Sequence, residues 1–507
     1  MSLLVSAITI AGYFLILLIL SRLSTRSADN DAFFRAGRRS PWPLVAFGMI
    51  GASLSGVSFV SVPGYVGLTQ MTYLQMCLGF VFGYLVVAFI LLPIYYRNNL
   101  TTIYSFLAMR LGPTSHKTGA LFFILSKATG AAVRFYLTCL VLQQFLFGPL
   151  GIPYIITVII VLLLVWLYTR RAGIRALVYT DCFQTLCFLL ALVAVIALVA
   201  HRLYPSVGVM VDSLCADPMS RIFVFDDWGS RQNFWKQFLS GVFIVVVMTG
   251  LDQDMMQKNL TCRNLRSAQK DMCLYGMSFV PVNLLLLLLG VMLYHVSASP
   301  EFHNYWSAHV GGTFPAANLT GDSLFPTLVQ SGVFGTGVMV LFVLGIAAAA
   351  FSSVDSALTA LTTSICIDIL GIENKPAAAH LPQNASAERT RKAVHLGVVA
   401  LFVVFVIAFR YINSTSAIDA IYTLASYTYG PLLGLFAFAI ICRGRALKDR
   451  YTPFIAILSP MICWGLSIIV PRLWGYTFGY ELLMLNGLIT FFGLMLFSRK
   501  RRTPCLA

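Results

Sequence analysis

The chain has 507 residues, of which 58% are hydrophobic and 11% are charged. Because a soluble globular domain carries roughly 25% charged residues, this composition excludes a soluble fold and predicts an all-α polytopic membrane protein. The formal net charge of +16 does not indicate a nucleic-acid partner, because the basic residues lie in alternate loops rather than on one face.

Apolar runs of about 20 residues match the length of helix that crosses a bilayer. They predict thirteen transmembrane helices, at 3–21, 43–66, 73–96, 120–148, 152–169, 178–201, 236–257, 272–297, 333–369, 393–412, 417–442, 453–470 and 478–498.

Lysine and arginine crowd every second loop, whereas the loop 298–332 contains neither. Cytoplasmic loops carry the excess of basic residues. The sequence therefore predicts an integral plasma (inner) membrane protein with its N-terminus outside and its C-terminus in the cytoplasm. An odd number of spans agrees with that orientation.

Two predicted spans are interrupted. The segment GASLSGVS at 51–58 lies within the second span, and TGLDQD at 249–254 lies within the seventh. The breaks are five spans apart, so the second block of five spans must run inverted relative to the first. Paired broken helices in corresponding halves are typical of a transporter's central site. Close helix packing by small residues is the alternative explanation for either break alone.

No segment between the spans is long enough to fold alone, so we expect a single membrane transport domain over 1–507. Residues 1–40 would form a leading span and cytoplasmic loop, 41–442 an inverted-repeat core, and 443–507 the trailing spans and a basic tail. Segment 375–391 has the composition of a flexible linker. We expect the bilayer and a small-molecule solute as partners, and a functional monomer.

The ninth span carries a polar stripe at helical spacing. Ser352, Asp355 and Ser356 lie within about one helical turn of each other. A buried carboxylate must be neutralised by a proton, a cation or a basic side chain, and we favour a cation or a salt bridge that opens during transport. Asp181, at the cytoplasmic start of span six, either complements the helix N-terminus and Arg175 or serves as a cation ligand or gate.

Arg134 lies in the middle of span four, where an arginine needs an acidic or carbonyl partner or a wet cavity. Three possibilities remain open: an ion pair with Asp355, a different pair, or a contact with a substrate carboxylate. Lys127 is closer to the cytoplasm and can extend its ammonium group to the interface.

Polar residues also flank the later breaks. Asp252 and Gln253 either line a substrate path or mark the cytoplasmic end of span seven, and the second interpretation is favoured for Asp254 and Lys258. In span eleven, tyrosines and serines precede a Gly-Pro break, which fits either an interfacial aromatic belt or a central gate.

Four motifs together resemble the sodium/solute symporter family, the group of sodium-coupled sugar, proline, pantothenate, sialic acid and iodide carriers. They are SLSGVSFVSVPG at 53–64, GIRALVYTDCFQT at 173–185, GLDQDMMQKNL at 250–260 and AAAFSSVDSALTALTTSICIDIL at 348–370. The resemblance implies a LeuT-like 5+5 inverted repeat, with spans two to six facing spans seven to eleven.

The resemblance also implies sodium sites. Na+ would be bound by the backbone carbonyls of Gly51, Leu54 and Ala349 and by the hydroxyls of Ser352 and Ser353. A second sodium ion, present in some members, corresponds to Asp181, Ser352, Asp355 and Ser356. Because Asp355 stands where those members have a hydroxyl, a second sodium site and a gate both remain possible.

The predicted function is a sodium-coupled secondary symporter that imports a small organic solute by alternating access. An amino or organic acid is favoured over a sugar, because Val245, Met248 and Thr249 replace the polar and aromatic groups of the sugar carriers. An ion channel or uniporter and a proton-coupled carrier on the same scaffold are the alternatives. An enzyme is not expected, because nothing pairs His295 or His395 with a nucleophile. The expected solute-binding residues lie near the breaks and in spans four and eleven: Ser55, Ser58, Arg134, Thr249, Gln253, Tyr422 and Ser426.

Overall fold

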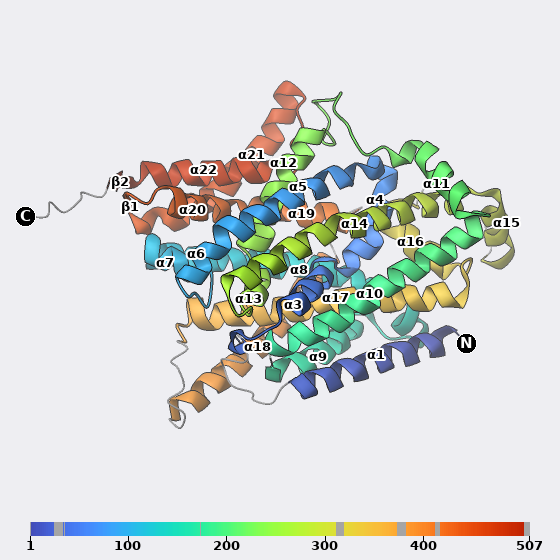
Figure 1. Ribbon diagram of the computed structural model, residues 1–507, viewed down its shortest axis with the longest axis horizontal. Helices are drawn as coiled ribbons and strands as arrows, with labels where there is room; N and C mark the ends of the chain where they lie inside the picture. Colours follow the sequence, from blue (N-terminus) through green and yellow to red (C-terminus); the bar gives the residue numbers. More distant parts are fainter. Residues whose placement is uncertain are drawn as a thin grey trace, which may run out of the picture.

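The computed structural model describes residues 2–24, 34, 36–172, 174–310, 319–372, 382–410 and 416–500. Nearly all of these residues are helical (Figure 1). A helix satisfies every backbone polar group within its own segment, which hydrocarbon surroundings demand. One small exception is an antiparallel pair of strands, β1 (Arg445–Leu447) and β2 (Ser498–Lys500).

The first half of the described chain contains the following α-helices: α1 (Ser2–Ser24), α3 (Trp42–Ser53), α4 (Gly56–Thr69), α5 (Tyr73–Val86), α6 (Leu92–Arg97), α7 (Ser105–Arg110), α8 (Pro113–Leu142), α9 (Tyr154–Ala172), α10 (Ile174–Leu203) and α11 (Val207–Ala216). Short 3-10 and π turns join several of them, namely η1 (Ala36–Arg38), η2 (Gln70–Thr72), η3 (Val87–Leu91), η4 (Gln143–Phe147), η5 (Gly148–Leu150) and η6 (Pro218–Ser220).

The second half contains α12 (Phe234–Val245), α13 (Gln253–Asn259), α14 (Leu265–Ala298), α15 (Pro300–His309), α16 (Leu324–Gln330), α17 (Gly335–Ser364), α18 (Pro382–Phe409), α19 (Ala417–Thr428), α20 (Gly430–Ile441), α21 (Thr452–Trp474) and α22 (Leu482–Leu496). Its short turns are η7 (Val246–Gly250), η9 (Gly321–Ser323), η10 (Ile365–Ile369) and η11 (Asp449–Tyr451).

Each of the thirteen predicted spans coincides with one of these helices or with an interrupted pair of them. Within the described residues, seven helices are long and apolar enough to cross a membrane, or up to nine if each bent pair counts as one span. The membrane-spanning architecture is therefore confirmed, whereas the number thirteen stays a prediction.

The predicted helix breaks are present. Helix α3 ends at Ser53 and α4 begins at Gly56, with a non-helical backbone at Leu54 (φ −80°, ψ 83°). The axes of α12 and α13 meet at 69°, and those of α19 and α20 at 46°. Glycine and serine at the first break, and Gly430-Pro431 at the last, weaken the helix at these points.

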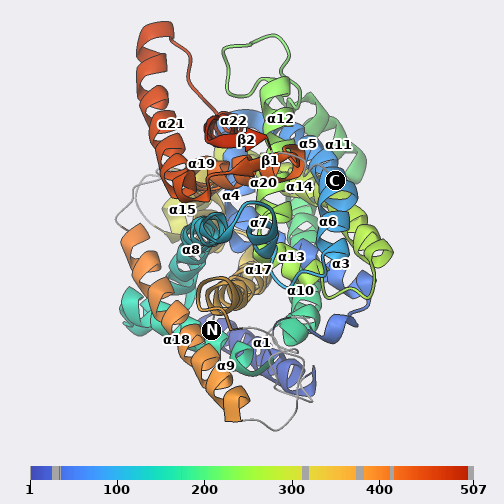
Figure 2. The ribbon, with the colours of Figure 1, turned by 90° about the vertical axis from the view of Figure 1, so that its left-hand side faces the viewer.

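Helix α17 lies at the centre of the bundle, where it contacts α10, α8, α4 and α3. Figures 1 and 2 show α19 to α22 on one side of α17 and α1, α9 and α18 on the opposite side. Residues 342–364 of α17 are almost entirely buried. The polar stripe of the ninth span is therefore inside the protein and away from lipid.

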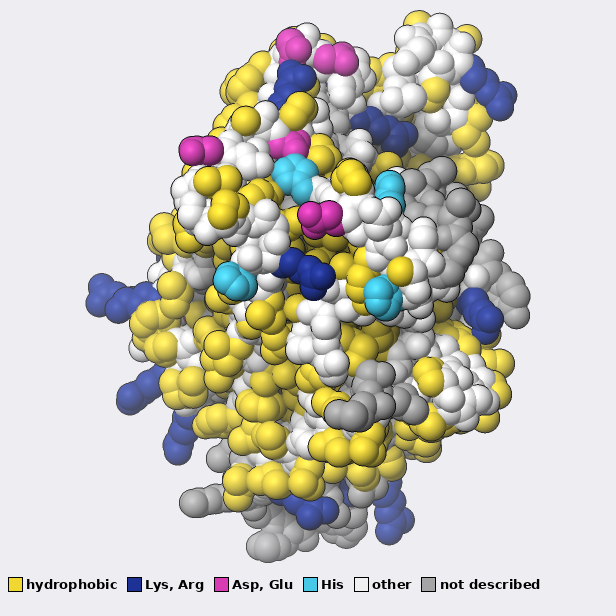
Figure 3. Space-filling model, turned by 90° about the vertical axis from the view of Figure 1, so that its right-hand side faces the viewer, with side chains coloured by type: hydrophobic (Ala, Val, Ile, Leu, Met, Phe, Trp, Pro, Cys, Tyr) yellow, Lys and Arg dark blue, Asp and Glu magenta, His cyan; other side chains and the backbone are white. Residues whose placement is uncertain are grey.

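The two ends of the bundle differ. Figure 1 places the start of α1, α11 and α15 at one end and β1 and β2 at the other. Asp, Glu and His side chains gather on the upper half of the first end (Figure 3). The first and the last described residues therefore lie at opposite ends of the bundle.

One organisational prediction is wrong in part. Residues 382–391, expected within a flexible linker, form the first turns of α18, whose helical geometry continues into the apolar run. Residues 375–381 of that linker, 25–33 of the first predicted loop and the basic tail from 501 lie outside the described residues.

Candidate functional site

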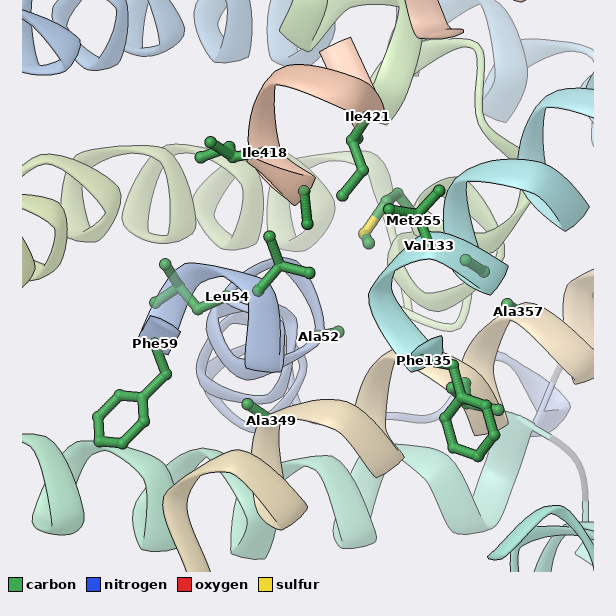
Figure 4. Close-up of a cluster of buried hydrophobic side chains, with 14 of the residues drawn as sticks. Ala52, Leu54, Phe59, Val133, Phe135, Met255, Ala349, Ala357, Ile418 and Ile421 are labelled. Atoms are coloured by element: carbon green, nitrogen blue, oxygen red, sulfur yellow. The ribbon is translucent and has the colours of Figure 1, made fainter. Parts of the chain in front are cut away.

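Several oxygen atoms lie close together where the first break meets α17. The Ser353 hydroxyl donates to the Ala52 carbonyl at 3.1 Å and to the Ala349 carbonyl at 3.2 Å. Figure 4 shows Ala349 lying beside Ala52 and Leu54 of the interrupted helix. The sequence-predicted ligand residues from spans two and nine therefore lie together at one point.

The break also frees backbone carbonyls. Ser58 N–H donates to the Ser55 carbonyl at 2.8 Å instead of to the Leu54 carbonyl. Among the described residues, no backbone hydrogen bond joins Ser55 N–H to the Gly51 carbonyl, as a continuous helix would. A hard cation with several oxygen ligands fits this set of carbonyls and hydroxyls.

Close packing against α10 holds the first break in place. The Thr185 hydroxyl accepts a hydrogen bond from Gly51 N–H at 3.1 Å. A Cβ atom at Gly51 would lie 2.1 Å from that hydroxyl oxygen, and one at Gly48 would lie 3.0 Å from the Asp181 Cβ. Only glycine allows α3 to approach α10 this closely, so α10 positions the cation ligands.

Asp181 joins α10 to α17 and α13. Its Oδ1 accepts the Ser352 hydroxyl at 2.7 Å, and its Oδ2 lies 2.7 Å from the Lys258 ammonium. Both charged side chains are almost fully buried, with exposures of 1% and 2%. Lys258 is a buried residue of the core because the bend before α13 turns it toward Asp181, and its expected position at the cytoplasmic end of the span stays a prediction.

Asp355 lies in the same buried region but has different partners. It accepts the Tyr168 hydroxyl at 2.7 Å and the Ser356 hydroxyl at 3.2 Å. Among the described residues, no ion pair joins Asp355 to Arg134. The first of the three possibilities for Arg134 is therefore wrong.

A second buried charge cluster connects α8, α13 and α19. The Lys127 ammonium lies 2.6 Å from Asp254 and 3.2 Å from Asp252, and the Tyr429 hydroxyl donates to Asp252 at 2.7 Å. Lys127 therefore does not extend to the membrane interface, because two buried carboxylates bind it. Asp254 likewise is buried in the core, paired with Lys127.

A cavity of about 80 Å³ lies beside this cluster, between α8, α12, α14 and α19. Its polar lining includes Arg134, which is half-buried and has no hydrogen-bond or ion-pair partner for its guanidinium among the described residues. Tyr84, Tyr275 and Tyr422 add hydroxyl groups, and Lys127 and Asp252 of the charge cluster also line the cavity beside apolar side chains. The lining comprises Ser53, Phe80, Tyr84, Ser126, Lys127, Gly130, Ala131, Arg134, Ile244, Val245, Met248, Thr249, Asp252, Met255, Tyr275, Phe279, Ile421, Tyr422, Leu424, Ala425 and Tyr429.

Of the predicted solute-binding residues, Arg134, Thr249 and Tyr422 line this cavity, whereas Ser55 and Ser58 do not. The Gln253 side chain is buried elsewhere, where its amide bonds the backbone of Thr101 and Ile103.

Ser426 lines a different cavity, of about 560 Å³, next to Asp419 and Tyr480. Of the tyrosines in the first cavity, Tyr84 and Tyr275 could not be recognised in the sequence, because spans that are distant in the chain bring them together with Tyr422.

Known proteins share this sequence pattern. The family model described as "Sodium:solute symporter family" matches residues 33–446. The sodium/sialic acid symporter NanT of Aliivibrio fischeri (strain ATCC 700601 / ES114) is 23% identical over 86% of this chain and 83% of its own length. The human sodium/iodide cotransporter is 28% identical over 49% of this chain, which spans only 38% of that protein's length.

A solved structure of a Na+-coupled sialic acid symporter in a substrate-bound, outward-open state shares the fold. The match covers 98% of this chain and 99% of that one, with a TM-score of 0.77 and 17% sequence identity. At this identity the likeness establishes the LeuT-like fold alone. Because the family model matches most of its length, this membrane transporter belongs to the sodium:solute symporter family and uses sodium.

Proposed function

We propose that the protein is a secondary symporter that couples sodium entry to import of a small organic acid. The observation that carries this proposal is Arg134, a half-buried arginine without a partner among the described residues, facing a small cavity beside the helix breaks. An arginine within the membrane requires an anionic or carbonyl partner or a wet cavity. A solute carboxylate would supply that partner through a bidentate contact.

The size and lining of the cavity support a small solute with an apolar part. A water molecule occupies roughly 10–15 Å³ of cavity volume. The cavity volume of about 80 Å³ therefore corresponds to a solute of only a few heavy atoms. Phe80, Val245, Met248 and Phe279 supply the apolar part of the lining. This lining favours a short amino or organic acid over a sugar, and the two relatives named above carry names for anionic solutes.

In this proposal the sodium ion binds between α3 and α17, to the carbonyls of Gly51, Leu54 and Ala349 and the hydroxyls of Ser352 and Ser353. Sodium binding fixes the break in helix α3–α4, and the solute binds in the adjacent cavity. If sodium favours the state that binds the solute, the solute must equally favour sodium binding. Thr249 and Tyr422 then contact the solute.

We further propose thirteen spans, with a 5+5 inverted repeat over 41–442 within one transport domain and with the N-terminus outside, in the plasma (inner) membrane. In this orientation the larger cavity beside Ser426, which is also lined by Arg231 from a loop predicted to be outside, would form the outer entrance. Tyr73 and Tyr422, whose hydroxyls lie 2.8 Å apart, would separate the entrance from the solute cavity.

The test is a thermal-stability screen of the purified protein in sodium and in potassium, with small carboxylic and amino acids and with the corresponding amides. A ligand that binds only the folded state stabilises it by mass action. We expect carboxylates, but not amides, to raise the Tm, and only in sodium. Arg134→Gln should lose the carboxylate response and keep the sodium response, whereas Arg221→Gln, at a surface ion pair, should keep both.

Equal stabilisation by carboxylates and amides, or an undiminished response of Arg134→Gln, would contradict the proposed substrate class. Carboxylate stabilisation that is the same in potassium would contradict the coupling.

A further inference from the structure

Lys258 occupies the place that a second sodium ion would require. The carboxylate that would bind this ion belongs to Asp181, and its Oδ2 already lies 2.7 Å from the Lys258 ammonium. Its Oδ1 accepts the Ser352 hydroxyl at 2.7 Å. Both oxygens of the carboxylate are therefore engaged by groups of the chain itself.

The helix break delivers the lysine to this point. Helix α12 bends by 69° into the short helix α13, which begins with Asp252 accepting a hydrogen bond from Asp254 N–H at 2.8 Å. After the bend, α13 contacts α3, α10 and α17. Lys258 thus reaches the same helices that carry the oxygen ligands of the first sodium site.

The chain itself already supplies the positive charge at Asp181. The Lys258 ammonium lies 2.7 Å from the Asp181 carboxylate, and both side chains are almost fully buried. The nearby Asp254 and Asp252 have a separate cation, Lys127, at 2.6 and 3.2 Å. A sodium ion bound to the same Asp181 carboxylate would bring a second positive charge next to the buried ammonium, which is costly in a low-dielectric interior.

Asp355 has partners of its own. Its carboxylate accepts two hydroxyl hydrogen bonds, from Tyr168 and Ser356. The residues that correspond to the second site are therefore all present, but the charged group that pairs with the Asp181 carboxylate is an ammonium group of the chain.

We propose that Lys258 is a tethered cation that takes the place of a second sodium ion, so that one sodium ion is coupled to each transport cycle. This inference rests on the proposed sodium coupling. The ammonium stabilises Asp181 in every state of the cycle, because it cannot leave, and the driving force then comes from the single ion at the first break.

The experiment counts sodium ions bound per chain, by equilibrium dialysis of purified full-length protein with radioactive sodium at saturation. We expect one ion for the wild type and two for Lys258→Met, because removal of the ammonium leaves Asp181 and Asp355 free for a second ion. The double variant Lys258→Met with Asp181→Asn should return to one. Lys392→Met, which removes an exposed lysine paired with Glu388, should also bind one.

Two ions per wild-type chain would overturn the inference, and so would a single ion in folded Lys258→Met. If Lys258→Met does not fold, the wild-type count still decides, because two ions would exclude the tethered cation. Failure of the proposed function is distinct, because a wild type that binds no sodium, or loses none with Ser353→Ala, would remove the first site itself.

Discussion

At the scale of single residues, the membrane environment makes every buried charge informative. Lys127, Lys258, Asp252 and Asp254 are all at most 6% exposed, and ion pairs connect each of them to an opposite charge. An isolated charge in a low-dielectric interior is costly. Arg134 differs because no such partner exists for it among the described residues, which is why it carries the substrate proposal.

Ser353→Ala should weaken sodium binding without unfolding the protein. The hydroxyl reaches the carbonyls of Ala52 and Ala349. Loss of its oxygen as a ligand of the sodium ion should cost about as much as the loss of a hydrogen bond to a charged group, about 1.5–3 kcal/mol. The sodium concentration for half-maximal stabilisation should therefore rise about 10- to 100-fold. Ser278→Ala, whose hydroxyl bonds only Leu274 of its own helix, is the matched control, and an unchanged sodium response of Ser353→Ala would disprove the site.

Lys127→Met should destabilise the protein, because it leaves Asp252 and Asp254 buried without a cation. Breaking a buried pair on one side costs about 3–5 kcal/mol. We expect a lower Tm in thermal unfolding, with partial recovery when Asp254→Asn is added. If the single variant kept the wild-type Tm, the ion pairs at 2.6 and 3.2 Å would not contribute to stability.

At the scale of elements, the function depends on interrupted helices held by close packing. The break between α3 and α4 exposes carbonyl groups, and the 69° bend between α12 and α13 places Lys258 beside Asp181. An unsatisfied backbone is tolerated in a membrane protein only where it is buried or lines a cavity. The breaks are thus the elements that build both the proposed ion site and the Lys258–Asp181 ion pair.

Gly51→Ala should separate α3 from α10. The added Cβ would meet the Thr185 side chain and backbone at 2.1 to 3.0 Å, and overpacking of this kind costs about 1–3 kcal/mol. We expect a reduced Tm and weaker sodium stabilisation in the same thermal assay. Gly397→Ala in α18 has open space for a Cβ and should behave as the wild type, so equal effects at the two positions would contradict the close-approach argument.

At the scale of the whole molecule, the two ends of the bundle carry different loops. The start of α1 lies with α11 and α15, and the β1–β2 pair lies at the opposite end (Figure 1). Basic residues concentrate in the loops predicted to be cytoplasmic. The arrangement agrees with import toward the basic end.

The orientation can be measured with Cys215, an exposed cysteine in α11. If the N-terminus is outside, a membrane-impermeant maleimide should label this cysteine in intact cells, and Cys215→Ser should abolish that labelling. Arg266→Cys in the Cys215→Ser background, at the start of α14, should be labelled only after permeabilisation. The reverse pattern would invert the topology.

The sequence by itself determined the class of the protein, because hydropathy, loop charge and Gly-Ser breaks are local properties that tertiary packing does not alter. The long spans and the breaks at 51–58 and 249–254 could be predicted in this way, whereas the cation ligands around Ser353 follow from the family resemblance and stay a proposal. Only the tertiary structure decided the partners of the buried charges. Lys258 meets Asp181, and Lys127 meets Asp254, across more than 70 residues of chain, and that geometry depends on bend angles that no local pattern specifies.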